Sequence, residues 1–474
     1  MMESKWARLL ELDRRYYLHN YYAAEEYSPT PIVKAEGAYI IDDKGNRLLD
    51  FAAQLMCVNV GNCHPKIQTA IRESLNTFGY VWEKYPTEPR VKATRLLMED
   101  ILGGDGWASK LRFVSTGSEA VEEGLILAKL YTNRPHIFTR LWAYHGWTEA
   151  AGSCTMIRKA RSILSSPRGH VRDVPGFYAG GYFVAPPPFC YRCPLGREYP
   201  ECKVDGKLGC IGLTERLIGA VGAETVAGVI TEIFMGVGAV VPPPEYIPQL
   251  RRLTRDLGIL WIDDEVVCGF GRTGKWFAYQ HYLPEVKPDV MVLGKGLVSA
   301  QLPAAGVVVN RKIAEFFEDY RWWHTPTYGA HPIVMAAVAA NIEAMIEEGV
   351  VDHAAKIGEY LGEGLRRLQE RHRCVGHVAG EGMFWVVEIV KSRETKEPFV
   401  EEDREAVYAG DTSNYPLSII AAKCLEKGCI MGGFTPNTLR ITPPLTLVEE
   451  EVDRGLEALD YALTVIDGMC PSQP

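Results

Sequence analysis

The feature that most constrains the fold is the alternation of short apolar runs with amphipathic stretches through the middle of the chain. Between several of the runs lie helical patterns such as SEAVEEGLILAKLYT and PEYIPQLRRLTRDLG. Nearly continuous apolar strands that alternate with helices are typical of a buried, mostly parallel sheet. The sequence therefore predicts an α/β fold, in which ligands bind beyond the carboxyl ends of the strands. The predicted strands span 111–115, 136–140, 226–233, 258–264, 289–294 and 304–310.

The pattern changes after about Tyr328. A long helical stretch, HPIVMAAVAANIEAMIEEG, leads into further helices and the short strands GMFWVVEIV and TLRITPP. A chain of 474 residues with 47% hydrophobic content can bury a core that is divided over more than one domain. We expect a large ligand-binding domain over 61–328 and a smaller α+β domain over 329–474, to which an N-terminal segment, 1–60, contributes.

Charge and hydropathy exclude several classes of partner. The formal net charge is -9, and no run of five or more Lys and Arg residues provides the basic surface that nucleic acid requires. The N-terminal residues are charged throughout, unlike a signal peptide. No apolar stretch reaches the roughly 18 residues of a membrane span. We expect a soluble, cytoplasmic protein that binds neither nucleic acid nor membrane.

Four of the twelve cysteines form a group, namely Cys190, Cys193, Cys202 and Cys210. A C-x-x-C pair begins the group, but seven residues separate the second pair, whereas a zinc ribbon has two to four. This spacing favours an ordered surface loop with free thiols or a disulfide over a structural metal site. The alternatives of free thiols, a disulfide and a metal stay open at this point.

The stretch WIDDEVVCGFGRTGKW resembles two nucleotide-binding motifs. Gly269, Gly271 and Gly274 match the dinucleotide fingerprint, and with Lys275 they match most of a P-loop. The fingerprint must open a helix, yet the aromatic, proline-containing KWFAYQHYLPEVKP follows, and a P-loop needs Ser or Thr where this chain has Trp276. A close-packed loop beside a site is the simpler interpretation, and a nucleotide-binding protein is the alternative from another functional class.

Two polar residues at strand ends carry a more specific signal. Lys295 directly follows an apolar strand, where partial burial would lower its pKa and favour a Schiff-base nucleophile. Asp264 ends another predicted strand, and a carboxylate there could keep a pyridine nitrogen protonated. Gly117 and Ser118 precede a helix whose N-terminus suits a phosphate, although an ordinary N-cap with Glu122 nearby explains the same residues.

The motifs TGSEAVE, AYHGW, IDDEVVCGFGRTGKWFA, LGKG, LPAAG, TYGAHP and LRITPPL occur in the order and spacing of class III aminotransferases. The chain resembles this family from 61 to its C-terminus. Its DEVVCGFGRTGKWFA motif is most similar to that of the branch that includes ω-amino acid:pyruvate and taurine:pyruvate aminotransferases. The resemblance implies fold type I, with a mostly parallel seven-stranded sheet and a smaller α+β domain. It also implies pyridoxal 5'-phosphate as cofactor and a homodimer or a dimer of dimers.

The resemblance also implies roles for individual residues around the cofactor ring. Lys295 would form the Schiff base and carry the proton, and Asp264 would pair with the pyridine nitrogen. Val266 would contact one face of the ring and Tyr144 the other, with His145 of the same AYHGW motif also binding the cofactor.

Further residues would bind the phosphate and the substrate. Gly117 and Ser118 would hold the phosphate, and Thr327 would reach the phosphate of the neighbouring subunit. Glu232 matches the glutamate of the family's Glu-Pro pair near the site and would help to bind the cofactor, although the proline is Ile233 here. Arg440 matches the arginine that binds a substrate carboxylate.

The chain departs from the family pattern at Trp147, Val237 and Val267, whereas LMCVNVG resembles LWCVNxG in pyruvate-using members. Trp147 and Val237 replace an arginine and a glutamate of the 4-aminobutyrate and ornithine branch, which disfavours 2-oxoglutarate as acceptor. Val267 stands where a glutamine often contacts the cofactor's 3' oxygen. Met56, in LMCVNVG, is expected to line the substrate pocket, with a core role as the alternative.

The sequence thus predicts transfer of an amino group from an amine or ω-amino acid to a small 2-oxo acid such as pyruvate. Two alternatives remain within the family. One is an isomerase, either an aminomutase or an amino acid racemase. The other is a 4-aminobutyrate-type aminotransferase that uses 2-oxoglutarate.

Overall fold

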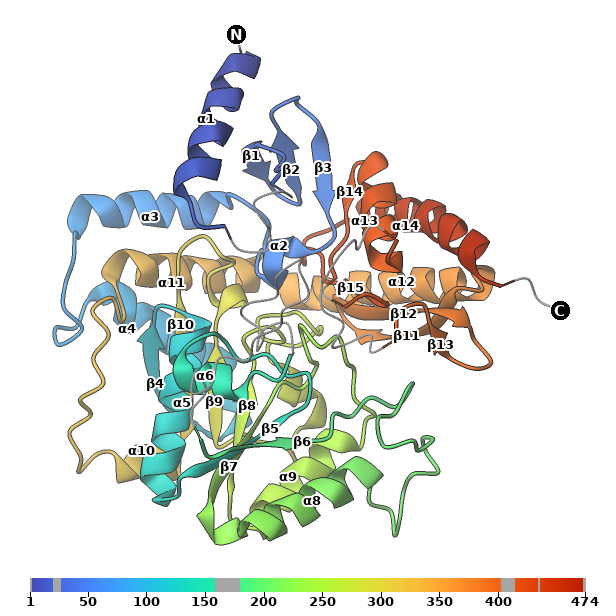
Figure 1. Ribbon diagram of the computed structural model, residues 1–474. Helices are drawn as coiled ribbons and strands as arrows, with labels where there is room; N and C mark the ends of the chain where they lie inside the picture. The colour runs from blue at the N-terminus through green and yellow to red at the C-terminus, as the bar shows by residue number, and fades with distance from the viewer. Residues whose placement is uncertain (1, 20–26, 158–179, 402–413, 434, 472–474) are drawn as a thin grey trace.

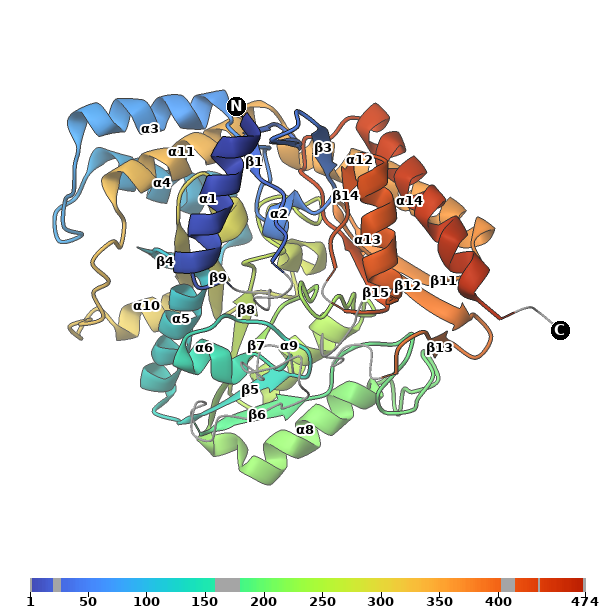
Figure 2. The ribbon, with the colours of Figure 1, turned by 45° about the horizontal axis from the view of Figure 1, so that its top comes forward.

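The structure, a computed structural model, describes residues 2–19, 27–157, 180–401, 414–433 and 435–471. Within these ranges the chain forms a central seven-stranded sheet and two four-stranded sheets. Figures 1 and 2 show the central sheet on one side of the molecule and the C-terminal helices and strands on the other.

The central sheet has the strand order β4-β10-β9-β8-β7-β5-β6. Strands β9, β8, β7, β5 and β6 are parallel, whereas β10 is antiparallel to both of its neighbours. The six predicted strands all lie in this sheet, so the predicted mostly parallel α/β fold is confirmed; only β6 was not recognised in the sequence. The strands are β4 (Ala108–Val114), β5 (His136–Arg140), β6 (Tyr182–Ala185), β7 (Val226–Thr231), β8 (Leu260–Asp264), β9 (Val290–Leu293) and β10 (Ala305–Asn310).

Both faces of the central sheet are buried, which explains why its strands are continuously apolar. On β8 and β9, Ile262 and Val292 face one apolar cluster, while Trp261 and Met291 face another. Helix α5 (Gly117–Thr132) covers the first face. The helix can approach the sheet closely because position 124 is glycine: a Cβ there would lie 3.2 Å from Val292. This close packing fixes the N-terminus of α5 beside the ends of the parallel strands.

Helices surround the sheet on its remaining sides. Helix α11 packs against α3 and α4 along one edge, and α8 packs against α9 and β6. The helices of this part are α2 (Ala53–Met56), α3 (Pro65–Thr77), α4 (Glu88–Arg95), α6 (Glu149–Cys154), α8 (Gly209–Val221), α9 (Tyr246–Asp256), α10 (Arg311–Phe316) and α11 (Pro332–Glu347). Helix α1 (Met2–Tyr16) stands apart from them at the top of Figure 1.

The two small sheets join distant parts of the chain. Strand β14 pairs in parallel with β3, so the N-terminal hairpin and the C-terminal region share a sheet. The other sheet places β15 beside β12. Their strands are β1 (Ile32–Glu36), β2 (Tyr39–Asp42), β3 (Arg47–Asp50), β11 (Val375–Glu381), β12 (Phe384–Ser392), β13 (Glu397–Pro398), β14 (Cys429–Ile430) and β15 (Thr438–Ile441). Helices α12 (Val350–Arg371), α13 (Pro416–Glu426) and α14 (Glu449–Met469) pack against them.

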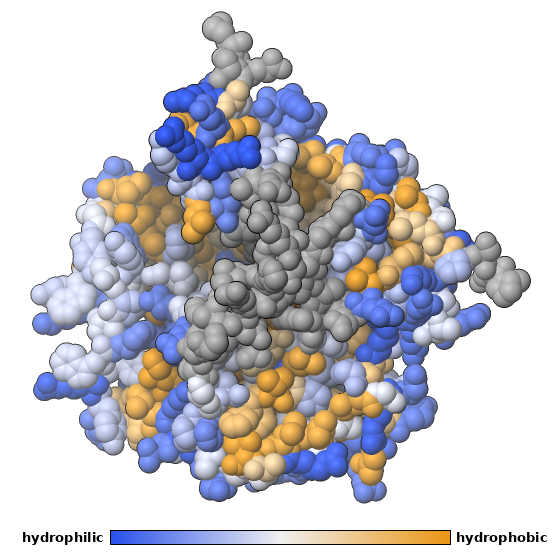
Figure 3. Space-filling view, viewed as in Figure 1, coloured by the Kyte–Doolittle hydropathy of each residue, from blue (hydrophilic) through white to orange (hydrophobic). Residues whose placement is uncertain are grey.

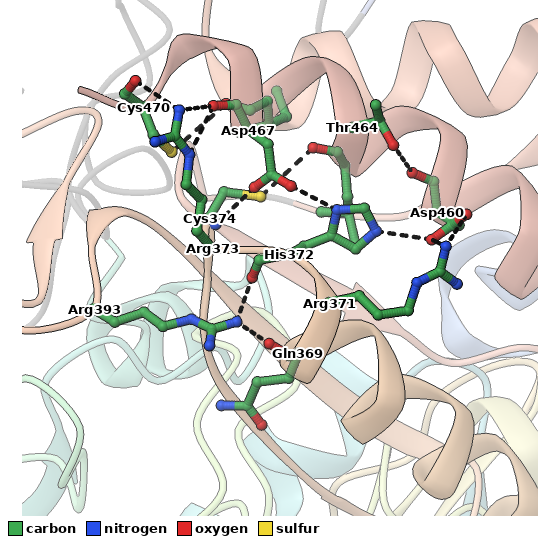
Figure 4. Close-up of polar contacts among 12 residues, drawn as sticks. Gln369, Arg371, His372, Arg373, Cys374, Arg393, Asp460, Thr464, Asp467 and Cys470 are labelled. Carbon is green, nitrogen blue, oxygen red and sulfur yellow. Dashed lines mark hydrogen bonds and ion pairs between the residues drawn. The ribbon is translucent and has the colours of Figure 1, made fainter. Parts of the chain in front are cut away.

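A buried histidine joins α14 to the end of α12 (Figure 4). Nδ1 of His372 lies 2.7 Å from Asp467, and its Nε2 lies 2.8 Å from Asp460. Arg373 donates to the backbone carbonyls of Asp467 and Cys470 at the C-terminal end of α14. These contacts anchor the last helix to the β11–β12 sheet.

The cysteine-rich segment forms an ordered loop between β6 and α8. Cys190, Cys193, Cys202 and Cys210 line one cavity of about 20 Å³ and are free thiols. In the described part of the chain, no group of three or more histidine, cysteine or acidic side chains is placed to hold a metal ion. The loop packs against the C-terminal sheet, where Arg192 lies 2.9 Å from Glu388.

The glycine-rich stretch after β8 forms a series of turns over 266–276. Gly271 has a φ of +87°, and a Cβ there would lie 2.8 Å from Leu445. The stretch is thus a close-packed loop and not the start of a helix.

Among the described residues, no helix is long and apolar enough to cross a membrane.

Candidate active site

The site is centred on Asp264, the last residue of β8. Its side chain is almost fully buried, and its two oxygens have different partners. Oδ2 lies 2.6 Å from Nδ1 of His145, and Oδ1 accepts the backbone N–H of Val266 at 3.0 Å. The carboxylate is therefore held from both sides at the carboxyl end of the sheet. Nε2 of His145 is buried and has no hydrogen-bond partner in the described structure.

Lys295 begins the turn that follows β9, the strand next to β8. Its backbone has a φ of +41°, which is strained for a residue with a side chain. Burial lowers the pKa of its amine, opposed by Cys57, Asp264 and Glu232, while Arg440 lowers it further. These groups lie close enough for their charges to act on the amine, so the structure brings Lys295, Asp264, Glu232 and Arg440 together.

Glu232 follows β7 and is 1% exposed. Its Oε1 accepts the backbone N–H of Tyr144 at 3.1 Å, and its Oε2 accepts that of Gly236 at 2.7 Å. Burial raises the pKa of Glu232, whereas His145 and the two N–H donors oppose the shift. Glu232 thus holds backbone segments in place next to the site.

Arg440 lies on β15 and is 2% exposed. Its guanidinium donates to the carbonyl oxygen of Gly236 at 2.8 Å. Val237, which follows Gly236 in the chain, provides no carboxylate that could neutralise the guanidinium of Arg440. A charged guanidinium in this buried position is suited to binding a carboxylate.

The N-terminus of α5 lies beside the Asp264 segment. A Cβ at Gly117 would lie 3.2 Å from Val266, so the helix terminus and the strand end are in close contact. Ser118 Oγ accepts the backbone N–H of Trp147 at 3.1 Å, and a Cβ at Gly146 would lie 2.3 Å from that oxygen. The N-cap of α5 is Thr116 and not Ser118. Ser118 therefore belongs to the first turn, where backbone N–H groups can bind an anion.

Three further predicted residues differ in their exposure to solvent. Trp147 is 48% exposed, and its ring meets that of Tyr144 edge-on at 6.3 Å. Thr327 is exposed, and its carbonyl oxygen accepts the hydroxyl of Tyr80 at 2.8 Å. Met56 is 2% exposed and belongs to the main apolar core, while its neighbour Leu55 is 52% exposed.

The turn that contains Met56 is strained. Ala53, Gln54 and Met56 all have positive φ angles, of 43°, 55° and 59°. The carboxylate of Asp50 accepts the backbone N–H of Gln54 at 2.8 Å and holds the turn. Cys57, which follows, lies near Lys295, and burial raises the pKa of its thiol. Sequence reasoning missed Asp50 and Cys57; the LMCVNVG motif pointed to this segment but not to these residues.

Arg272 ties three parts of the chain together beneath the site. It is fully buried, and its Nη atoms donate to the carbonyl oxygens of Met383 and Pro443 and to Oδ1 of Asn59. Burial lowers the pKa of this guanidinium. The sequence did not indicate these contacts with the N-terminal and C-terminal regions.

Two further buried acids, Asp263 and Glu265, flank Asp264 in the chain. The sequence alone does not distinguish their roles from that of Asp264. Burial raises the pKa of Asp263 well above its usual value, and neighbouring Glu265 adds to the shift. Burial also raises the pKa of Glu265 to about 8. Burial thus favours the uncharged form of both acids.

Comparison with known proteins identifies the family. The family model of class-III aminotransferases matches residues 21–463. The chain belongs to the class-III aminotransferases. The predicted resemblance, fold type I and transferase class are thereby confirmed, and aminotransferases of this family depend on pyridoxal phosphate.

Individual members of the family cover nearly the whole chain. An S-selective transaminase from Arthrobacter sp., solved with alanine bound, is 45% identical with a TM-score of 0.93 and covers 98% of both chains. A taurine:2-oxoglutarate aminotransferase from Bifidobacterium kashiwanohense, in complex with PLP and glutamate, is 28% identical with a TM-score of 0.87; the match covers 98% of both chains. A leucine/methionine racemase from Thermococcus litoralis is 31% identical over 446 residues, 93% of this chain and 92% of the racemase.

Proposed function

We propose that this class-III aminotransferase uses pyridoxal 5'-phosphate to move an amino group from an amine or ω-amino acid to a small 2-oxo acid such as pyruvate. The observation that carries the proposal is the convergence of Lys295, Asp264 and Arg440 on one buried site. A nucleophilic amine, a carboxylate and a guanidinium supply what amino-group transfer between carboxylate-bearing substrates requires.

The residues fit the cofactor. The N-terminus of α5, with Gly117 and Ser118, would bind the phosphate, because the first-turn N–H groups and the helix dipole favour an anion. Asp264, already oriented by His145, would pair with the protonated pyridine nitrogen, and Val266 and Tyr144 would contact the two ring faces. Bound there, pyridoxal phosphate supplies an aldehyde that condenses with amines and a ring that withdraws electrons.

Lys295 would serve first as the amine that holds the cofactor and then as the proton carrier at the substrate Cα. Burial lowers the pKa of the amine, which increases its uncharged fraction at neutral pH. Only the uncharged amine has the lone pair for nucleophilic attack or for proton abstraction. The position of Lys295 one strand away from Asp264 suits both tasks.

Arg440 would bind the carboxylate of the 2-oxo acid. Its guanidinium is held in place by a hydrogen bond to the carbonyl oxygen of Gly236, and its forked donors match the geometry of a carboxylate. Trp147 lacks the positive charge that would bind a second carboxylate, and Val237 lacks the acid that would neutralise Arg440 in one half-reaction. Both features support a monocarboxylic acceptor. The alanine bound to the Arthrobacter relative, the amino form of pyruvate, is consistent with this choice.

A racemase is the second candidate, because the Thermococcus leucine/methionine racemase is similar over nearly the whole chain. Racemisation needs the same amine and carboxylate but returns the proton to the opposite face of Cα. The taurine:2-oxoglutarate aminotransferase among the similar structures makes 2-oxoglutarate, the acceptor of a 4-aminobutyrate-type aminotransferase, the alternative acceptor, although Trp147 and Val237 disfavour it.

A second copy of the chain would complete the site. Tyr80, Trp82, Tyr85 and Tyr328 are each 46–65% exposed, and the hydroxyl of Tyr80 donates to the carbonyl oxygen of Thr327. Further apolar side chains gather over α3 at the upper left of Figure 3. An apolar surface of this kind indicates a protein interface, and we propose that it forms a homodimer in which Thr327 reaches the partner's phosphate.

We also propose the domain limits 61–328 and 329–474, with residues 1–60 joined to the smaller domain.

The experiment is a transamination screen of the purified holoenzyme. Amines, ω-amino acids and taurine are each supplied with pyruvate or 2-oxoglutarate, and the amino acid product is quantified. We expect alanine from pyruvate and little glutamate from 2-oxoglutarate. Incubation with a single enantiomer of leucine or alanine without a 2-oxo acid is the second arm. Racemisation there, with no transfer to pyruvate from any donor, would overturn the proposal.

A further inference from the structure

Glu232 connects two backbone segments that the proposed reaction uses separately. One segment carries Tyr144, whose N–H donates to Oε1 at 3.1 Å. The other carries Gly236, whose N–H donates to Oε2 at 2.7 Å. Each carboxylate oxygen therefore accepts one N–H from a different loop, and the side chain is 1% exposed.

The Gly236 side of this connection leads to the substrate arginine. The carbonyl oxygen of Gly236 accepts the guanidinium of Arg440 at 2.8 Å. Gly236 is thus held by Glu232 through its N–H and in turn holds Arg440 through its carbonyl oxygen. A Cβ at position 236 would lie 2.9 Å from Val267 and 3.3 Å from Glu232, so the backbone can approach this closely only as glycine.

The Tyr144 side leads to the cofactor site. Tyr144 immediately precedes His145, whose Nδ1 lies 2.6 Å from Asp264. The N–H that Glu232 fixes is therefore one residue from the histidine that orients the pyridine partner. A shift of Glu232 would displace the aromatic ring and the histidine together.

We propose that Glu232 is a positioning residue that couples the carboxylate-binding Arg440 to the cofactor contacts of Tyr144 and His145. This inference rests on the proposed function and assigns Glu232 no direct contact with cofactor or substrate. A carboxylate is required because both oxygens must accept hydrogen bonds at once. Gln has one acceptor oxygen, and its NH₂ group would face an N–H donor.

The test compares Glu232→Gln and Glu232→Ala with the wild-type holoenzyme. The matched control is Glu388→Gln, because Glu388 is also a fully buried acid but is paired with Arg192 and Thr438. Two affinities are measured without turnover: that for pyridoxal phosphate, from the visible absorbance of the bound cofactor, and that for propionate, from its effect on that absorbance. KM for pyruvate and kcat are measured separately.

In Glu232→Gln, we expect both the cofactor and propionate to bind about tenfold more weakly, since each end of the connection loses a charge-assisted hydrogen bond. KM for pyruvate should rise by a similar factor, and Glu232→Ala should be affected at least as strongly. The Glu388→Gln variant should keep both affinities even if its thermal midpoint falls.

A Glu232→Gln variant that loses stability but keeps both affinities would reduce Glu232 to a structural role and overturn the inference. Loss of only one affinity would overturn the coupling. Both binding measurements remain valid if the wild type transfers no amino group. Failure of the proposed function is therefore distinguishable from failure of this inference.

Discussion

The Nδ1 atom of His145 lies 2.6 Å from Oδ2 of Asp264, and both side chains are almost fully buried. The second carboxylate oxygen accepts the backbone N–H of Val266. With both oxygens held, the carboxylate cannot rotate away from the pyridine nitrogen that we propose it binds. The imidazole thus contributes orientation, while the carboxylate contributes the charge.

Replacement of Asp264 should therefore cost more than replacement of His145. For Asp264→Asn we expect kcat to fall about 100-fold or more, because a neutral amide cannot stabilise the protonated ring. For His145→Asn the expected loss is about tenfold, because the Asn amide can still donate to Asp264. Steady-state kcat with pyruvate and the visible spectrum of the holoenzyme provide the measurement. Equal losses in the two variants would contradict this division of roles.

The lowered pKa of Lys295 predicts how the stability of the apoenzyme depends on pH. The folded protein releases the amine's proton at a lower pH than the unfolded chain, whose lysine has its usual pKa of 10.5. Between these two values unfolding takes up a proton, so this group's contribution to stability rises with pH. Below the folded pKa, the cost of the buried charge is present in full.

The substitution Lys295→Met should accordingly raise the thermal midpoint of the apoenzyme, and by more at pH 7 than at pH 10. Subtracting the wild-type midpoint at each pH removes the contributions of the other titrating groups. A stabilisation that is the same at both values would show that the pKa of Lys295 is not lowered by folding. Lys275→Met, in the loop after β8, is measured in the same way as the control for replacing a lysine by methionine.

The positions of Lys295 and Asp264 could be predicted from sequence because both depend on local pattern: a polar residue follows an apolar strand, and parallel strand ends meet at one edge. The contacts of Arg272 could not. Its partners Met383 and Asn59 are 111 and 213 residues away, and nothing near Arg272 in the sequence specifies them. The neutral Gly236 carbonyl that anchors Arg440 was likewise hidden, because any residue supplies a carbonyl and only the fold brings it there.

Arg272→Lys should reduce both stability and substrate binding. A lysine cannot reproduce the forked contacts with Met383, Pro443 and Asn59, so we expect a loss of about 3 kcal/mol in the free energy of unfolding. Because these contacts join the regions that carry Lys295 and Arg440, KM for pyruvate should rise about tenfold. Denaturant unfolding and steady-state kinetics measure the two effects.

Arg373 provides the control for the Arg272→Lys prediction. Arg373 also donates to several backbone carbonyls, at the C-terminal end of α14 and outside the proposed site. Arg373→Lys should lower stability but leave KM for pyruvate unchanged. A rise in KM in both variants would mean that KM follows general destabilisation and not the position of Arg272.

The contacts of His372 predict an acid-dependent anchor for the last helix (Figure 4). Although burial raises the pKa of Asp467, hydrogen bonds from Cys374 and His372 lower it overall. A carboxyl group whose pKa is lowered by folding contributes stability above its unfolded pKa of 3.8, and this stability disappears as pH falls through the folded pKa. His372→Ala should therefore cost about 1–3 kcal/mol at pH 7, since it also leaves Asp460 and Asp467 without their shared partner. The thermal midpoints of variant and wild type should converge as the pH is lowered below about 4. A midpoint difference that persists unchanged in acid would instead assign the loss to the cavity left by the ring.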